Sequence, residues 1–318
     1  MVEENGRVVV TDTQAGAFLL ERFGGEAGPP AAVGQGEWSK AYAFSRADTD
    51  YIVRFSTLDE DFEKDRLAAA RYSSRDLPIP PIIELGEALD GFYAISERVP
   101  GSYLDDVDER QMRTLLPSLF AALDATRFAD VSATLGYGIW EADGNAPHPT
   151  WRAALLDVVN DRPIDRVHGW RERLASSATG MGRFEEALRL FQALVDQAPE
   201  GRHLIHSDLL HFNVLVSGDQ ITAVIDWGCS MYGDFLYDVA WFSFWSPWYR
   251  AWDGIDFASE AWRHFESIGL TVPHFEERLR CYELHIGLSG QAYCAFAGHW
   301  DDLEWTAQRS LAVAQQTG

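Results

Sequence analysis

The chain is poor in cysteine and in positive charge, and each shortage excludes a class of protein. Its three cysteines, Cys229, Cys281 and Cys294, form no Cys-x-x-Cys pair, so neither a disulfide framework nor a zinc site is expected. Only 26 basic residues stand against 49 acidic ones, for a formal net charge of -23. Nucleic acids and anionic membranes bind through Lys and Arg, so neither partner is expected. A cationic ligand would be attracted, although the acids could equally serve only to keep the surface solvated.

The sequence also lacks a long apolar run, an internal repeat and a low-complexity segment. No stretch approaches the roughly 20 apolar residues that a membrane helix needs. Residues 1–10 carry early acids instead of the basic and then apolar pattern of a signal peptide. We therefore expect a cytoplasmic protein, as a monomer or weak dimer. The 318 residues, 47% of them hydrophobic, are enough for two lobes with a sizeable core.

Strand patterns dominate the first third of the chain. A short amphipathic helix at 11–23, capped by Asp12 or Thr13, precedes five predicted strands and one further helix. Two strands lie within 31–45, one at 51–56, the helix at 61–74, and the last two strands at 81–89 and 92–97. The Asp-Gly pair at 90–91 is typical of a tight turn between these last strands. We expect a small, mostly antiparallel sheet.

Beyond residue 100 the pattern becomes mainly helical. Helices are predicted at about 105–125, 150–160, 168–177 and 182–197, and three or four more follow residue 228, the longest between Pro273 and Gly298. The segment 96–101 is the expected hinge. The predicted fold class is α+β, with an N-terminal lobe at 1–98 that binds nucleotide and a helical C-terminal lobe at 99–318 that carries catalysis and substrate binding.

Three polar residues, Asp208, Asn213 and Asp226, lie at the edges of a predicted hairpin. Residues 203–205 are predicted as a brief strand, 206–213 as a loop, and 214–226 as two strands joined by a Ser-Gly-Asp turn. Carboxylate and amide oxygens suit magnesium, which usually completes its shell with water and substrate phosphates. The pattern indicates phosphoryl transfer, in which one acid orients the attacking hydroxyl while an Asn and a second Asp hold the metal.

This arrangement, His-x-Asp-x4-Asn followed 13 residues later by Asp, resembles the catalytic loop and metal-binding aspartate of the protein-kinase-like fold. With "HSDLLHFNVL", "AVIDWG", "GDFLYDVA" and "LPIPPIIELG", most of the chain is similar to the aminoglycoside phosphotransferases. More closely, "RHLIHSDLLHFNVL", "ITAVIDW", "FWSPW" and "YIVRFS" resemble phosphotransferases of hygromycin B. The resemblance implies a bilobal kinase-like fold, with a small antiparallel-sheet N-lobe and a larger, mainly helical C-lobe.

The resemblance also implies roles around the hairpin. Asp208 is the expected catalytic base, and Asn213 and Asp226 are the expected Mg²⁺ ligands. His206 is expected to support the loop by bonding backbone near Asp226, and Asp238 by bonding the backbone of the catalytic loop. The alternatives are that Asp208 only caps its loop and that Asn213 only ties it together.

A second set of residues is expected to bind ATP or GTP. These are Gly36, Ser39, Arg54, Asp65, Glu97 and Val99. Arg54 stands where the kinase pattern has Lys, and Asp65 where it has Glu. The pair can still be bidentate while the guanidinium faces the phosphates. The alternative is an ordinary surface ion pair between Arg54 and Glu63. The Gly-rich turn also lacks the third glycine of the nucleotide-binding pattern.

A third set of residues is expected to contact the acceptor. The expected substrate contacts are His211 in the loop, Trp241 in an aromatic stripe and Glu283 on the long helix. The alternatives are that His211 is a plain loop residue, Trp241 a core residue and Glu283 a solvated acid. The implied reaction moves the γ-phosphate of ATP or GTP to a hydroxyl of an aminocyclitol antibiotic, hygromycin B or a relative. The added phosphate would confer resistance by opposing binding to ribosomal RNA. The alternatives are a kinase for a macrolide, choline or homoserine-like alcohol, and a pseudokinase that binds nucleotide without turnover.

Overall fold

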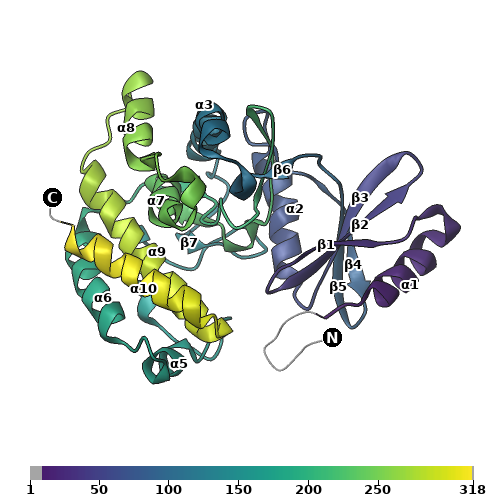
Figure 1. Cartoon of the computed structure of the whole chain (residues 1–318), viewed down its shortest axis with the longest axis horizontal. Coiled ribbons are helices and arrows are strands. Elements are labelled where there is room, and N and C mark those ends of the chain that lie inside the picture. The colour runs from purple at the N-terminus through teal and green to yellow at the C-terminus, as the bar shows by residue number, and fades with distance from the viewer. Residues whose placement is uncertain (1–8, 317–318) are drawn as a thin grey trace. The chain divides into compact units, whose positions relative to one another are not determined.

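The computed structural model describes residues 9–316, which form two compact units (Figure 1). The first unit contains the chain up to Leu104 together with Glu141–Gly144 and Asn213–Gly228. The second contains Asp105–Trp140, Asn145–Phe212 and the chain from Cys229 onward. The predicted lobe boundary at residues 98 and 99 stays a prediction. The N-terminal segment that was expected not to be a signal peptide lies largely outside the described residues.

The first unit is built on a five-stranded antiparallel sheet in the order β1-β2-β3-β5-β4. Its elements are β1 (Ala31–Gln35), β2 (Ser39–Arg46), β3 (Thr49–Ser56), β4 (Ile82–Ala88) and β5 (Gly91–Glu97), with helices α1 (Asp12–Phe23) and α2 (Glu60–Tyr72). Alternate residues of β2 and β3, such as Tyr42 and Phe55, are buried against Phe18 of α1. The expected strands and helices are present, and the α+β class is confirmed.

Two local details of the sequence interpretation were wrong. Helix α1 is capped by Thr11, not by Asp12 or Thr13, because the Thr11 hydroxyl accepts the Gln14 N–H while the Gln14 side chain accepts the Thr11 N–H. In the β4–β5 hairpin the two left-handed turn residues are Leu89 and Asp90, with φ of 53° and 57°. The last ladder pair is Ala88 with Gly91, so the turn lies one residue earlier than the Asp-Gly signal indicates.

A small antiparallel sheet in the first unit, in the order β10-β9-β6, contains the predicted hairpin. Its strands are β6 (Ser102–Tyr103), β9 (Val214–Ser217) and β10 (Gln220–Val224). Val214 pairs with Val224, and the Ile225 N–H donates to the Asn213 carbonyl at 2.9 Å. Asn213 and Asp226 therefore lie at the same, open end of the hairpin, opposite the turn at Gly218.

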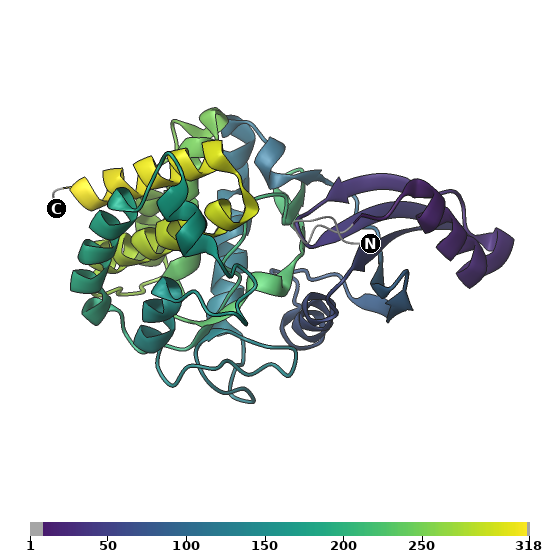
Figure 2. The same ribbon diagram turned by 90° about the horizontal axis from the view of Figure 1, so that it is seen from below.

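The second unit is mainly helical. Its helices are α3 (Glu109–Phe128), α4 (Trp151–Leu156), α5 (Trp170–Ser176), α6 (Gly182–Leu194), α7 (Leu236–Trp245), α8 (Phe257–Ser267), α9 (Phe275–Ala297) and α10 (Trp300–Gln315). A small sheet adds β7 (Gly138–Ile139), β8 (His203–Ile205) and β11 (Met231–Gly233) in the order β7-β11-β8. Figures 1 and 2 both show α10 lying along α9. None of the helices within residues 9–316 combines the length and apolar character needed to cross a membrane.

Asp234 lies two residues before α7 and is bound mainly to α9. Both of its oxygens accept hydrogen bonds from the Arg278 guanidinium, at 2.7 and 2.9 Å, and Oδ2 also accepts the Tyr282 hydroxyl at 2.5 Å. The Leu236 N–H reaches Oδ1 only at 3.3 Å. Asp234 and Arg278 are both buried, so this ion pair ties the start of α7 to α9 inside the core.

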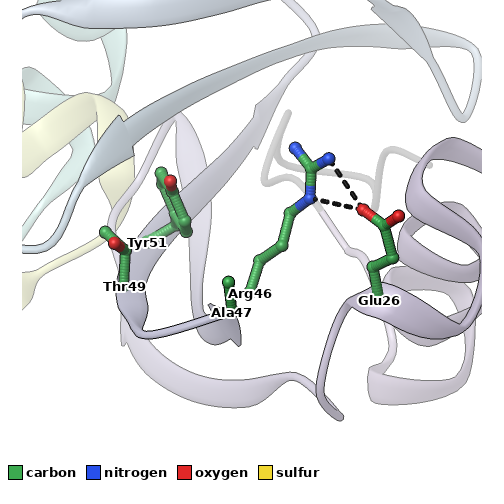
Figure 3. Close-up of a pocket in the computed structure, with 5 residues that line it drawn as sticks. All are labelled: Glu26, Arg46, Ala47, Thr49 and Tyr51. Carbon is green, nitrogen blue, oxygen red and sulfur yellow. Dashed lines mark hydrogen bonds and ion pairs between the residues drawn. The ribbon is translucent and has the colours of Figure 1, made fainter.

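A shallow hollow of ≈ 390 Å³ lies at the turn between β2 and β3 (Figure 3). It is lined by Glu26, Arg46, Ala47, Thr49 and Tyr51. The Arg46 guanidinium donates to the Glu26 carboxylate at 2.8 and 3.1 Å, so the charges in this hollow are already paired with each other. None of the predicted site residues lines it.

Candidate active site

Arg54 on β3 pairs with Asp65 on α2, as one of the two sequence alternatives predicts. A guanidinium nitrogen donates to Asp65 Oδ2, and both side chains are largely buried, 19% and 7% exposed. Glu63, the alternative partner, instead accepts from Arg66 at 2.7 Å on the exposed face of the same helix. The pair is therefore an internal contact between sheet and helix and not an ordinary surface ion pair.

Helix α2 also holds the backbone that follows Asp226. The second oxygen of Asp65 accepts the Trp227 N–H at 2.7 Å, and Lys64 Nζ donates to the Gly228 carbonyl at 2.5 Å. Lys64 is fully buried. Sequence reasoning missed Lys64, whose only signal is a lysine next to the expected partner of Arg54. Two consecutive residues of one helix thus fix the segment that carries the predicted metal ligand.

Arg54 lies in an acidic environment within the first unit. Burial lowers the pKa of its guanidinium, but the charges of Asp65, Asp226 and Asp61 outweigh this and raise the pKa overall. Asp61 and Asp226 approach each other closely, since a methyl group added at Gly228 would lie 3.0 Å from Asp61 Oδ1 and 3.3 Å from Asp226 Oδ1. Three carboxylates therefore gather near one guanidinium, and Asp61 is a member of this group that sequence reasoning did not identify.

The donor set at the open end of the hairpin fits a magnesium ion that retains other ligands. Asn213 is buried, whereas Asp226 is exposed and has a left-handed backbone, φ 61°. Within residues 9–316 no group of three or more His, Cys, Asp or Glu side chains is arranged to hold a metal ion. One amide and one carboxylate oxygen would leave most coordination positions to water and phosphate, which is the usual situation for Mg²⁺.

The other predicted nucleotide residues lie along the sheet of the first unit. Gly36 is in the turn between β1 and β2, where its N–H donates to the Ser39 carbonyl at 2.9 Å. A methyl group added at Gly36 would lie 3.8 Å from Ser39 Oγ, so the two predicted residues are adjacent. Glu97 ends β5 opposite Tyr51, and Val99 follows in the segment that leads to β6.

In the second unit Asp208 lies three residues beyond the end of β8 and contacts His211. The His211 Nδ1 is 2.9 Å from Asp208 Oδ1, and both side chains are partly exposed. Burial lowers the pKa of His211, but the hydrogen bond and charge of Asp208, with the charges of Asp105 and Asp302, raise it overall. Sequence reasoning gave His211 as a substrate contact, with a plain loop residue as the alternative, and did not foresee that its ring is the hydrogen-bond partner of the predicted base.

Two buried residues support the backbone just before Asp208. Asp238, in the first turn of α7, accepts the N–H groups of His206 and Ser207 at 2.9 and 2.8 Å. His206 Nδ1 lies 3.2 Å from the Asp208 N–H, and the His206 side chain is fully buried. Burial raises the pKa of Asp238 to about 7, the two backbone hydrogen bonds oppose this rise, and the charge of Asp208 adds to it. Both residues therefore act on the loop and not on a ligand.

Two tryptophans of α7 border the His211 ring edge to face. The ring centroids of His211 and Trp241 are 6.0 Å apart, and those of His211 and Trp245 are 5.0 Å apart. Trp245 also stacks on Trp305 of α10 at 5.4 Å. The buried indole N–H groups of Trp241 and Trp245 have no hydrogen-bond acceptor in the described part of the chain. Trp241 therefore lies next to His211, the partner of the predicted base, at one edge of an aromatic group.

Glu283 is placed differently from the other predicted substrate residues. It is buried on α9, accepts the Ser243 hydroxyl at 2.6 Å and lies 3.4 Å from the Arg309 guanidinium. Burial raises the pKa of Glu283, and the charge of Arg309 opposes that rise. It also borders a hollow of ≈ 950 Å³ formed largely by residues of α8 and α9. Its contacts join α7, α9 and α10, so Glu283 is not the solvated acid that the alternative interpretation describes.

The chain is similar to known phosphotransferases over most of its length. Residues 31–275 match the phosphotransferase enzyme family. The hygromycin-B 4-O-kinase of Escherichia coli is 31% identical over 307 residues, which cover 96% of this chain and 86% of the kinase.

Solved structures of phosphotransferases are similar to this chain in fold. Aminoglycoside phosphotransferase APH(4)-Ia is similar with a TM-score of 0.83 and 31% identity, over 97% of this chain and 100% of that one. A thermostable mutant of the same phosphotransferase, in a ternary complex with AMP-PNP and hygromycin B, also gives a TM-score of 0.83, with 30% identity over 95% of this chain and 98% of that one. Spectinomycin phosphotransferase APH(9)-Ia, 12% identical over 97% of this chain and 100% of that one, shares the fold with a TM-score of 0.62.

Proposed function

Since the chain belongs to the phosphotransferase enzyme family, we propose that it transfers the γ-phosphate of ATP or GTP to a hydroxyl of an aminoglycoside or aminocyclitol antibiotic. Hygromycin B or a relative is the proposed acceptor, because the hygromycin-B 4-O-kinase is similar over nearly the whole chain and a thermostable mutant of APH(4)-Ia forms a ternary complex with AMP-PNP and hygromycin B. Family membership confirms the prediction of a phosphotransferase. The cytoplasmic location and the monomeric or weakly dimeric state stay predictions.

The observation that carries the proposal is the placement of the three polar residues of the motif. Asp208 lies on a supported loop with His211 as its partner, which suits a base that orients a hydroxyl and accepts its proton late in the transfer. Asn213 and Asp226 lie together at the end of the hairpin, where they would hold Mg²⁺. The metal would neutralise charge on the transferred phosphoryl group.

Arg54 is the proposed contact to the nucleotide phosphates. Asp65 fixes one edge of its guanidinium, and the remaining N–H groups of this five-donor group would bind phosphate oxygens. Gly36 and Ser39 would cover the phosphates from the β1–β2 turn, and Glu97 and Val99 would contact the nucleotide from the end of β5. These assignments rest on position within the sheet and on the family pattern.

The acceptor is proposed to bind near His211 and Trp241. Trp241, which borders the His211 ring, would offer an aromatic face to the acceptor. Ammonium groups gain from aromatic faces and from the negative charge of Asp105 and Asp302, which act on His211 in the same unit. Glu283 is a weaker candidate, because its contacts are with Ser243 and Arg309.

A direct test is ADP release by the purified protein with ATP or GTP, Mg²⁺ and one acceptor at a time. Hygromycin B, a second aminoglycoside, a macrolide, choline and homoserine form the panel, and ³¹P NMR identifies the phosphorylated product. We expect acceptor-dependent turnover with hygromycin B or a relative. Turnover only with a macrolide, choline or homoserine would replace the acceptor class. Tight nucleotide binding without turnover on any acceptor would support a pseudokinase and contradict the proposal.

A further inference from the structure

Asp105 holds the backbone of the loop between the predicted base and the metal-binding hairpin. Its Oδ1 accepts the His211 N–H at 2.8 Å, and its Oδ2 accepts the Phe212 N–H at 3.0 Å. Asp105 is separated from them by 106 and 107 residues in the sequence. One carboxylate thus takes two consecutive amides of the catalytic loop, and all three residues belong to the second unit.

The two amides belong to residues in an unfavourable conformation. His211 and Phe212 have φ of 59° and 71°, in the left-handed region that residues with a Cβ rarely adopt. A non-glycine residue there persists only when its surroundings fix it. The two hydrogen bonds from Asp105 provide such a restraint, and because the acceptor is charged they are stronger than bonds between neutral groups.

Asp105 is itself fixed from the segment after α7. The Tyr249 hydroxyl donates to Asp105 Oδ1 at 2.6 Å. The Tyr249 ring stacks on Trp252 at 4.4 Å, and the Trp252 indole N–H donates to the Val107 carbonyl at 2.9 Å, two residues beyond Asp105. Burial and the charge of Asp105 raise the pKa of Tyr249, so its hydroxyl remains a donor. The carboxylate is therefore held in place independently of the loop.

The restraint reaches the predicted base through His211. The backbone at residue 211 decides where the imidazole lies, and its Nδ1 meets Asp208 Oδ1 at 2.9 Å. On its other side the ring is bordered by Trp241 and Trp245. A loop that left the left-handed conformation at residues 211 and 212 would carry the imidazole away from Asp208. The Asp208 carboxylate would then lose its contact with the imidazole.

We propose that Asp105 is a positioning residue for phosphoryl transfer, which keeps the 208–212 loop in its left-handed conformation and, through His211, orients the Asp208 carboxylate. This inference rests on the proposed function for its catalytic consequence, whereas the effect on the loop does not depend on it. Asp105 acts on the loop backbone and on Tyr249, so its loss should lower kcat and leave nucleotide affinity nearly unchanged.

The test compares Asp105→Asn and Asp105→Ala with Asp106→Asn, a matched control that removes an exposed neighbouring acid. Asn offers one acceptor oxygen and places a donor against the second amide, so its defect should be intermediate. We expect kcat to fall about 10-fold in Asp105→Asn and about 100-fold in Asp105→Ala, as expected for loss of charge-assisted hydrogen bonds that position a base. The dissociation constant of AMP-PNP should change less than about 3-fold, because that loss is confined to the loop.

A second readout is independent of turnover. Hydrogen–deuterium exchange of peptides covering 207–213 should become at least about 10-fold faster in both Asp105 variants and remain unchanged in Asp106→Asn. If the wild-type protein turns over no acceptor, the proposed function fails, and the exchange result still decides the role of Asp105. Unchanged exchange in both Asp105 variants would overturn the inference. So would a kcat within about 2-fold of wild type, or a loss confined to nucleotide affinity.

Discussion

Replacing Asp65 by Asn should destabilise the first unit by removing one of the two contacts that this carboxylate makes. Asp65 Oδ2 pairs with the Arg54 guanidinium, and Oδ1 accepts the Trp227 N–H at 2.7 Å. An Asn in the same rotamer keeps an acceptor for the Trp227 N–H. It presents an NH₂ group to the Arg54 guanidinium, which is itself a donor, and it removes the negative charge. The change therefore isolates the charged contact to Arg54 from the contact to the backbone.

The expected loss of stability depends on the charges that would still surround Arg54. Removing one partner of a buried ion pair typically costs about 3 to 5 kcal/mol, because the other charge is left uncompensated. Here Asp226 and Asp61 also raise the pKa of Arg54, so part of the compensation would remain. We therefore expect the free energy of unfolding to fall by roughly 1.5 to 3 kcal/mol, which is the usual contribution of a hydrogen bond to a charged group. The KM for ATP should rise as well, since Arg54 would no longer be oriented.

The measurement is urea unfolding followed by tryptophan fluorescence, with Glu63→Gln as the control. Glu63 pairs with Arg66 at the surface, with side chains 30% and 56% exposed, so its loss should cost about 0.5 kcal/mol or less. Equal destabilisation by the two substitutions would show that Asp65 has no special role. A loss below about 0.5 kcal/mol in Asp65→Asn, the range of ordinary surface changes, would also refute the reasoning.

Four further outcomes are expected. Burial lowers the pKa of His285 from 6.5 to about 4. The neutral ring therefore contributes up to about 3 kcal/mol to the free energy of unfolding above pH 6.5, and this contribution is lost as the pH falls to 4. Urea unfolding at pH 7.5 and 5 should therefore show a smaller decline in His285→Gln than in wild type. Asp208→Asn should lower kcat at least about 100-fold with little change in nucleotide affinity, as measured by ADP release and AMP-PNP binding. Arg278→Met should cost about 3 to 5 kcal/mol in urea unfolding, because it leaves Asp234 buried without its cation. Chelation of Mg²⁺ by EDTA should abolish turnover and weaken ATP binding measured by calorimetry, and unchanged binding would count against the metal site.

The elements with strong local signals could be predicted from the sequence. The β9–β10 hairpin follows from two apolar runs separated by a Ser-Gly-Asp turn, and Asn213 and Asp226 lie at its open end because they flank those runs. The long helix between Pro273 and Gly298 was predicted for a similar reason, since both of its ends carry breaking residues. For this hairpin and this helix, one short segment contains the whole signal, and the prediction agrees with the structure.

The errors and omissions arise where partners are distant in sequence or where two local signals compete. Lys64 reaches the Gly228 carbonyl across 164 residues, and Asp105 reaches His211 across 106, so no periodic pattern indicates either contact. The β4–β5 turn lies one residue earlier than the Asp-Gly pair predicts, because the ladder pairs Ala88 with Gly91. There the sheet register outweighed the usual turn preference.

The structure also bears on the alternative of a pseudokinase, whose only support in the sequence is the exchange of Lys for Arg at position 54. In the first unit Arg54 is a cation fixed by Asp65 and surrounded by the charges of Asp65, Asp226 and Asp61. Guanidinium binds phosphate with a planar, forked set of donors, and here one edge of that fork is already anchored. Lys64, the nearby lysine of α2, donates to the Gly228 carbonyl and so supports the loop after Asp226. The exchange at position 54 therefore keeps a fixed cation beside the metal-ligand candidate, which is the arrangement that phosphoryl transfer requires.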